Sequence, residues 1–317
     1  MTADRRVVAA VDCGTNSTRL LLAHVDGRGV DPLVRRTALT RLGAGVDASG
    51  RLSEAAITRV GDVLADYARQ WRDAGAVRVA MTATSAVRDA TDAAVFLTTV
   101  RDITGADVTV LTGAQEAALT FEGATAGTSG RRVVCDIGGG STELISGDGR
   151  VDRWVSMQVG SVRLRERHLH GDPPSVAEYA ALVNGIDDVL ARQDDAFTAV
   201  GCHPQIAVAG TALTVAAVAV GATAPDVDAV DGTVLSSVDV AQVIEDLAWV
   251  PAAQRLALPP VVPGREDVIV AGALLLSRLL TRFGFDAVEV RVADLLDGIA
   301  RRVGADAWPP AAIDGAT

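Results

Sequence analysis

The chain has 317 residues, with 40 acidic and 29 basic side chains that give a net charge of −11, and all 29 basic residues are Arg. The absence of Lys excludes Walker A sites, protein-kinase active sites and Schiff-base catalysis, because each needs an ε-amino group. An acidic chain with 3% aromatic residues is a poor nucleic-acid binder. The three Cys are far apart, and no apolar run approaches the ~20 residues of a membrane span. We therefore expect a reduced, cytoplasmic protein without membrane contact.

Hydrophobic patterning predicts an alternation of strands and helices. Two strand–turn–strand segments stand out, at residues 5–21 and 131–145. Between them the pattern predicts a helix at 53–74, a strand at 77–83, a helix at 91–103, a strand at 107–111 and a helix at 114–126. After the second segment it predicts a strand at 153–158, helices at 161–169 and 175–191, a strand at 205–209, helices from 211, at 237–249 and at 265–283, a strand at 288–292 and a helix at 294–302.

The two strand–turn–strand segments form an internal repeat. Placing Asp12 on Asp136 also superposes a Gly, a Ser, a Thr and a Leu, at an offset of 124 residues. Two such hairpins at domain-sized spacing, each followed by helices and strands, predict an α/β fold with two similar domains. We place the first domain at 1–126, the second at 127–304 with its last helix able to pack back on the first, and a tail at 305–317.

A strand that ends in Asp and is followed by Gly, Ser and Thr is typical of phosphate sites, since backbone amides converge there on an anion. Asp12 and Asp136 would repel this anion unless a cation lay between them, so we interpret both as ligands of Mg²⁺. A plain tight hairpin is the alternative, and the duplication disfavours it. The expected phosphate-binding residues are Gly14, Thr15, Asn16, Ser17, Gly138, Gly139, Gly140, Ser141 and Thr142.

The motifs along the chain resemble those of the exopolyphosphatase/guanosine pentaphosphate phosphohydrolase (Ppx/GppA) family, within the actin/sugar-kinase/Hsp70 superfamily. In the family's order they are VDCGTNSTRLLL (11–22), ATSAVRDA (83–90), LTGAQEAALTFEG (111–123), VCDIGGGSTEL (134–144), VGSVRLRE (159–166), AGTALTVAA (209–217), REDVIVAG (265–272) and ADLLDGI (293–299). The resemblance implies two actin-like (ribonuclease H-like) domains with a cleft between them. It is to the short, two-domain, actinobacterial-type form, which implies a preference for shorter substrate chains.

The resemblance also implies roles for three further residues. Glu116 would be the catalytic base that orients water, although its position alone also fits a solvent-facing Glu at a helix start. Glu143 would be a second active-site carboxylate. Arg88 would grip a phosphate through its planar fork, with a salt bridge to Asp89 or Asp92 as the alternative.

Other candidate cations and two Cys adjoin these motifs. Three Arg in the segment after Gly160 favour a helix with solvated side chains, while an extended polyanion track is the alternative; they are Arg163, Arg165 and Arg167. Further candidate cations for a chain substrate are Arg19, Arg41 and Arg265. Cys13 and Cys135 are expected to be small buried residues rather than nucleophiles.

These observations predict an exopolyphosphatase that releases terminal phosphate from inorganic polyphosphate by Mg²⁺-assisted attack of water, with K⁺ as a further candidate cation. The runner-up is a 5′-phosphohydrolase of guanosine pentaphosphate (pppGpp) with a place in the stringent response. Two functions from different classes stay open: a non-enzymatic sensor of (p)ppGpp or polyphosphate, and an ATP-dependent small-molecule kinase of the same superfamily. The expected partners are polyphosphate, pppGpp or ppGpp, and a second copy of the chain in a homodimer.

Overall fold

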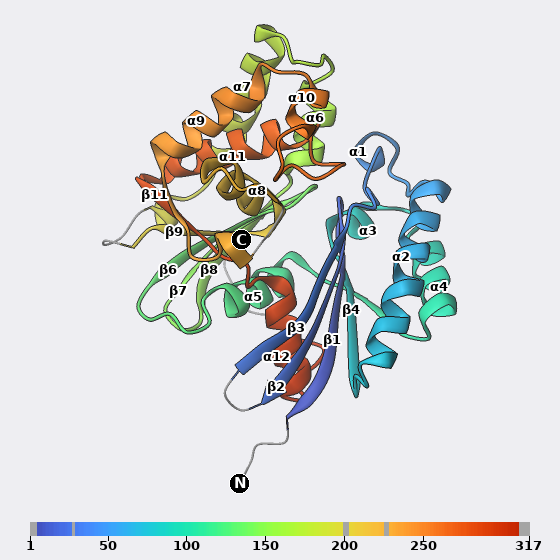
Figure 1. Cartoon of the computed structure of the whole chain (residues 1–317). Coiled ribbons are helices and arrows are strands. Elements are labelled where there is room, and N and C mark those ends of the chain that lie inside the picture. Colours follow the sequence, from blue (N-terminus) through green and yellow to red (C-terminus); the bar gives the residue numbers. More distant parts are fainter. Residues whose placement is uncertain (1–4, 27–28, 199–202, 225–227, 311–317) are drawn as a thin grey trace. The chain divides into compact units, whose positions relative to one another are not determined.

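The computed structural model describes residues 5–26, 29–198, 203–224 and 228–310, and the chain divides into two compact units (Figure 1). The first unit comprises residues 1–126 and 293–315, and the second comprises 127–292. The division after residue 126 coincides with the expected boundary. Residues 293–304, which we placed in the second domain with the last helix able to pack back on the first, belong to the first unit.

The first unit is built on a five-stranded mixed sheet in the order β3-β2-β1-β4-β5. The first three strands are antiparallel, and β4 and β5 run parallel to β1. The strands are β1 (Arg6–Cys13), β2 (Thr18–Asp26), β3 (Gly29–Ala38), β4 (Arg78–Ala83) and β5 (Val108–Val110). The helices are α1 (Val46–Ser49), α2 (Glu54–Asp73), α3 (Ser85–Asp89), α4 (Ala93–Thr104), α5 (Gly113–Ala124) and α12 (Leu295–Gly304).

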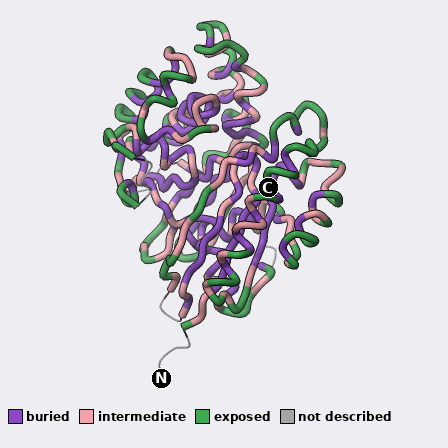
Figure 2. The backbone as a smooth tube through the Cα atoms, turned by 45° about the vertical axis from the view of Figure 1, so that its right-hand side comes forward, coloured by how far each residue is buried: buried purple, intermediate pink, exposed green. Residues whose placement is uncertain are grey.

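Strand β1 is buried on both faces, which explains its unbroken apolar sequence. Ala9, Val11 and Cys13 pack in one cluster with residues of α2 and α4. Val8 and Ala10 pack in another with residues of α5 and α12. The tube in Figure 2 is accordingly purple along the central strands, while the helices alternate between buried and exposed residues.

The second unit repeats this topology. Its sheet has the order β10-β11-β9-β6-β7-β8, so β8-β7-β6-β9-β11 matches β3-β2-β1-β4-β5 in strand order and direction. The strands are β6 (Arg132–Ile137), β7 (Thr142–Gly147), β8 (Val151–Met157), β9 (Gln205–Val208), β10 (Val234–Ser236) and β11 (Ala287–Val290). The helices are α6 (Ser161–His168), α7 (Val176–Leu190), α8 (Ala209–Ala219), α9 (Ser237–Ala248), α10 (Ala252–Leu256) and α11 (Ile269–Phe283). This repeated order confirms the expected α/β fold with two ribonuclease H-like domains.

Two differences from the predicted elements have local causes. Strand β3 was not expected, because Pro32 and a register shift opposite Leu22 and Ala23 break its alternation. Helix α11 begins at Ile269 rather than at residue 265, after a turn in which the amide of Val268 donates to Arg265. The tail beyond residue 310 lies outside the described residues.

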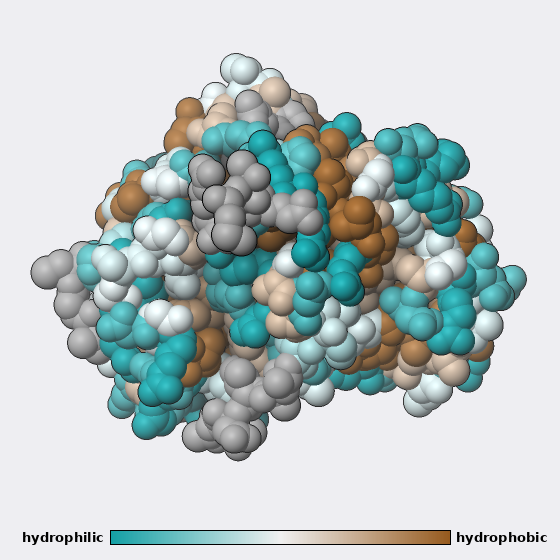
Figure 3. Space-filling view, turned by 90° about the horizontal axis from the view of Figure 1, so that it is seen from below, coloured by the Kyte–Doolittle hydropathy of each residue, from teal (hydrophilic) through white to brown (hydrophobic). Residues whose placement is uncertain are grey.

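No helix in the described part of the chain combines the length and the apolar character that crossing a membrane requires. On the face seen in Figure 3, hydrophobic residues form several separate groups among hydrophilic ones. Such scattered hydrophobic residues are ordinary on a protein surface.

Helices α5 and α12 pack backbone to backbone through two Gly. A Cβ atom on Gly123 would lie 1.9 Å from the carbonyl oxygen of Asp294, and one on Gly298 would lie 2.0 Å from that of Leu119. Since neither position has room for a side chain, this contact holds α12 on the first sheet, beside the helix that carries Glu116.

We predict that Gly298→Ala lowers the free energy of unfolding of the first unit by about 1–3 kcal/mol, because the new methyl group meets fixed backbone. Urea denaturation followed by circular dichroism measures this loss. Gly61→Ala is the matched control, since its Cβ would meet only the tip of Ile103 at 2.8 Å. Ala also favours the helix by about 1 kcal/mol. Equal losses in both variants would contradict the packing argument.

Candidate active site

The first turn, residues 14–17, is fixed by hydrogen bonds that leave three of its backbone amides without an acceptor among the described residues. The amide of Gly14 donates to Ser17 at 2.9 Å, and the carbonyls of Thr15 and Asn16 accept from Gly43 and Arg41 at 2.8 and 2.9 Å. The amides of Thr15, Asn16 and Ser17 have no acceptor among the described residues. Convergent free amides of this kind bind anions.

The second turn, residues 138–141, has the same design. The amides of residues 161–163, which open helix α6, donate to the carbonyls of Gly138 and Gly139 at 2.9–3.1 Å. The amides of residues 139–141 have no acceptor within the described chain. Two turns that both present unpaired amides favour an anion cradle over a plain hairpin.

The hydroxyl of Thr142 is used within the fold rather than in the turn. It is fully buried and donates to the carbonyl of Val159 at 2.6 Å. This hydrogen bond disfavours the expected contact between the Thr142 hydroxyl and a phosphate.

The two Asp face different cross-strand partners. Asp12 lies opposite Arg19, whereas Asp136 lies opposite Glu143. Arg19 Nη2 contacts Asp12 at 3.0 Å, and the same guanidinium also pairs with Asp294. Burial raises the pKa of Asp12, against the opposing effect of Arg19. Asp12 therefore shares one cationic partner, Arg19, with Asp294, and its role as a metal ligand stays a prediction.

Asp136 and Glu143 form a buried acidic pair, with 6% and 1% of their surfaces exposed. Ser156 donates a hydrogen bond of 2.6 Å to Glu143. The two residues lie directly opposite each other in the antiparallel pair of β6 and β7, so their carboxylates lie on one face of the sheet. In the described residues no group of three or more His, Cys, Asp or Glu could hold a metal. Mg²⁺ commonly binds through one or two carboxylates plus water and substrate oxygens, so this pair fits it.

Arg88 and Glu116 come together at the ends of neighbouring parallel strands, β4 and β5. Arg88 Nη1 donates to the carbonyl of Leu111 at 2.6 Å and to Glu116 at 3.2 Å. Glu116 is only 7% exposed, so the solvent-facing alternative is wrong. Arg88 Nη2 is buried with no partner in the described part of the chain, which leaves a donor for an anion. Asp92 instead accepts from the amide of Leu52 and pairs with Arg51.

The edge of the second sheet beside Asp136 also carries Arg265. Val208, the last residue of β9, pairs with Asp136. The next residue, Ala209, has a φ of 66°, a strained value for a residue with a side chain. A Cβ on Gly210 would lie 1.9–2.2 Å from the guanidinium of Arg265. Arg265 was expected as a cation for the substrate, but the close packing of its guanidinium against Gly210 was not predicted.

Two other expectations concern the Arg residues of helix α6 and the Cys residues. Arg163, Arg165 and Arg167 lie on helix α6, so they point in different directions rather than forming a track. Cys13 and Cys135 are buried, and burial raises the pKa of both thiols, as expected for residues that are not nucleophiles. Cys202 lies outside the described residues.

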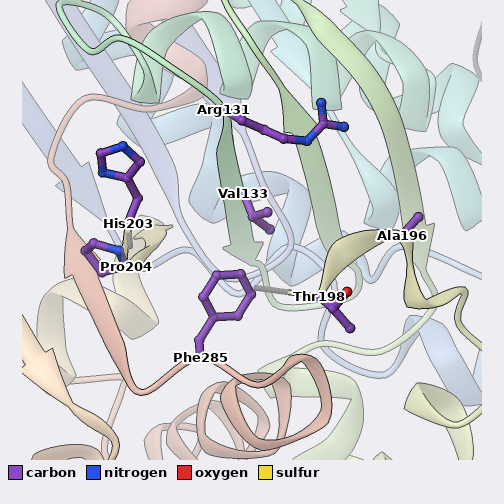
Figure 4. A pocket seen from close by; sticks show the side chains of 7 residues that line it. All are labelled: Arg131, Val133, Ala196, Thr198, His203, Pro204 and Phe285. Carbon is purple, nitrogen blue, oxygen red and sulfur yellow. The ribbon is translucent and has the colours of Figure 1, made fainter. Parts of the chain in front are cut away.

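Two surface pockets among the described residues lie away from these side chains. The one in Figure 4, with room for about one water molecule, is lined by Arg131, Val133, Ala196, Thr198, His203, Pro204 and Phe285. Arg131 directly precedes β6, at the opposite end of that strand from Asp136. The other pocket lies where β2 ends and β3 begins. Neither contains an expected site residue.

The chain is similar to known proteins of one phosphatase family. The model of the Ppx/GppA phosphatase family matches residues 21–300. The chain belongs to this family. It is 40% identical over 309 residues to "Exopolyphosphatase 2" of Mycobacterium tuberculosis, covering 92% of this chain and 97% of that protein. A crystal structure of an exopolyphosphatase-like protein superposes with a TM-score of 0.90 and 34% identity, covering 95% of this chain and 98% of that one.

A second group of family members is more distant. "Guanosine-5′-triphosphate,3′-diphosphate pyrophosphatase" of Vibrio atlanticus is 33% identical over 207 residues. That match covers 64% of this chain and 41% of the relative. The similarity to this second group is therefore both lower and shorter.

We predict that Gly210→Ala displaces the guanidinium of Arg265 and raises the KM for a polyphosphate substrate about tenfold, the effect of losing one charged hydrogen bond. Steady-state kinetics of Gly210→Ala, Arg265→Ala and the double variant test this. The double variant should lose no more than Arg265→Ala alone, since both changes remove one interaction. Additive losses would show that Gly210 acts independently of Arg265.

Proposed function

We propose that the protein is an exopolyphosphatase that hydrolyses the terminal phosphoanhydride bond of inorganic polyphosphate. The observation that carries the proposal is the pair of amide-lined turns at 14–17 and 138–141, each close to a buried Asp at the end of the preceding strand. The 40% identity to a protein named exopolyphosphatase over nearly its whole length supports this substrate class.

The proposed chemistry divides among a few side chains. Glu116, buried and held by Arg88, accepts the proton of the attacking water. The unpaired Nη2 of Arg88 donates to a phosphate oxygen. The free amides of each turn stabilise charge on the phosphate group bound to that turn, as fixed donors do in phosphoryl transfer. Arg265 adds a cation for the polyphosphate chain.

A divalent cation fits the acidic pair of the second unit. We assign Asp136 and Glu143 as its protein ligands, in place of the Asp12 and Asp136 set expected from the sequence. Mg²⁺ bound there would neutralise phosphate charge and orient phosphate oxygens.

The alternative substrate is pppGpp, on the strength of the Vibrio relative. Both substrates end in a phosphoanhydride, so the turns and Glu116 serve either. Released orthophosphate from each pure substrate distinguishes them: a kcat/KM higher for pppGpp than for polyphosphate would reverse the assignment.

We predict that Glu116→Gln lowers kcat for polyphosphate by about 10²–10⁴-fold, because it removes the base. The KM should change little. Glu122→Gln is the matched control on the same helix, since Glu122 pairs with Arg302 at 2.7 Å. Orthophosphate release measures both variants, and retained turnover in Glu116→Gln would contradict the assignment of Glu116 as the base. Binding of polyphosphate without any phosphate release by the wild type would favour a non-catalytic sensor.

We predict that a chelator abolishes activity and that added Mg²⁺ restores it. Asp136→Asn and Glu143→Gln should each raise the Mg²⁺ concentration for half-maximal activity by at least about tenfold, because each removes a metal-site carboxylate. Asp12→Asn should leave that concentration unchanged, since its partner is Arg19. An equal shift in Asp12→Asn would restore Asp12 to the ligand set.

A further inference from the structure

The second turn has three peptide groups whose direction must be fixed, and helix α6 can fix only two of them through its backbone. The amides of Ser161, Val162 and Arg163 donate to Gly138 and Gly139. The next amide, that of Leu164, donates to Gly160 at 2.9 Å and begins the hydrogen bonding of the helix itself. No backbone amide of the helix is therefore left for the carbonyl of Gly140.

The side chain of Arg163 supplies the missing donor. Its Nε donates to the carbonyl of Gly140 at 2.8 Å, and its Nη2 contacts Gln158 at 3.3 Å. No backbone amide in the described part of the chain donates to the Gly140 carbonyl. Because a trans peptide points its carbonyl and its amide in opposite directions, this bond directs the amide of Ser141 into the turn.

We propose that Arg163 is a positioning residue, which orients the Gly140–Ser141 peptide for phosphate through its Nε donor. The inference rests on the proposed function, since it takes the turn to be the phosphate cradle. The first turn needs no such side chain, because backbone amides of Gly43 and Arg41 hold its carbonyls.

Two substitutions at the same position separate the donor from the charge. Gln carries an N–H group on the same carbon, Cδ, to which Arg Nε is attached, so Arg163→Gln keeps a donor close to that place and loses the charge. Arg163→Met loses both. Arg165→Met is the matched control, because it removes a positive charge from the same helix without removing a donor to Gly140.

The test is steady-state kinetics on polyphosphate, together with calorimetric binding of inorganic tripolyphosphate to the same variants. Arg163→Met should raise the KM and the dissociation constant about tenfold, as expected for one hydrogen bond of about 1.4 kcal/mol. Arg163→Gln and Arg165→Met should stay within about threefold of wild type. The change should appear in KM more than in kcat, because a misdirected amide weakens binding before and during the reaction.

Each contrary result has a definite meaning. Equal losses in Arg163→Gln and Arg163→Met would overturn the proposal in favour of a role for charge, and wild-type values in both would overturn it altogether. If Arg163→Met does not fold, a tenfold higher KM in Arg163→Gln than in Arg165→Met overturns it, and equal values support it. Failure of the proposed function is a separate outcome, seen as a wild-type protein that binds tripolyphosphate but releases no phosphate from polyphosphate.

Discussion

The direction of a few peptide groups is the constraint on which the rest of the candidate site depends. An amide can face an anion only if the carbonyl of the same peptide is satisfied on the other side, because the two groups point in opposite directions. Backbone amides of the loop at 41–43 donate to the carbonyls of the first turn, and backbone amides of helix α6 donate to carbonyls of the second. These neighbours approach closely: a Cβ on Gly43 would lie 2.3 Å from Thr15, and one on Gly160 would lie 2.6 Å from Gly139. Gly43 and Gly160, which lie outside the turns, are therefore also needed for this close approach to the turns.

The two halves of the repeat have diverged at one position that decides their electrostatics. Arg19 in the first hairpin and Glu143 in the second occupy equivalent places, directly opposite the Asp near the end of the preceding strand. In the first hairpin, Asp12 pairs with the guanidinium of Arg19, which also pairs with Asp294. In the second hairpin, two buried carboxylates, Asp136 and Glu143, lie opposite each other. This difference is the reason why we propose both protein ligands of a metal in the second unit, although the duplicated Asp suggested one ligand from each unit.

The sequence predicted the features that are local or repeated. The apolar run of β1, the offset between Asp12 and Asp136, and the helix that begins near Glu116 all follow from short-range patterns. The cross-strand pairing of Asp12 with Arg19 could have been predicted from the sequence, because a four-residue turn sets the register of the hairpin. What the sequence did not predict depends on contacts between distant segments. The hydrogen bond from Arg163 to the Gly140 carbonyl is of this kind, since no periodicity encodes which backbone a side chain will meet. The packing of α12 on the first sheet, by contrast, was among the expectations.

Helix α12 and its cap residue Asp294 contact the two parts of the first unit that carry candidate site residues, namely α5 with Glu116 and the hairpin with Asp12. Asp294 caps the helix through the amide of Leu296 and pairs with Arg19, while the backbone of α12 touches α5 at Gly123 and Gly298. Buried ion pairs contribute little net stability, because removing the charges from water offsets their attraction, but breaking one leaves an uncompensated charge. The ion pairs of Arg19 therefore add little to the free energy of unfolding, but loss of Arg19 would leave the buried carboxylates of Asp12 and Asp294 without this cation. Since α5 carries Glu116 and Arg19 pairs with Asp12, this one helix fixes the proposed base and the first turn within the same unit.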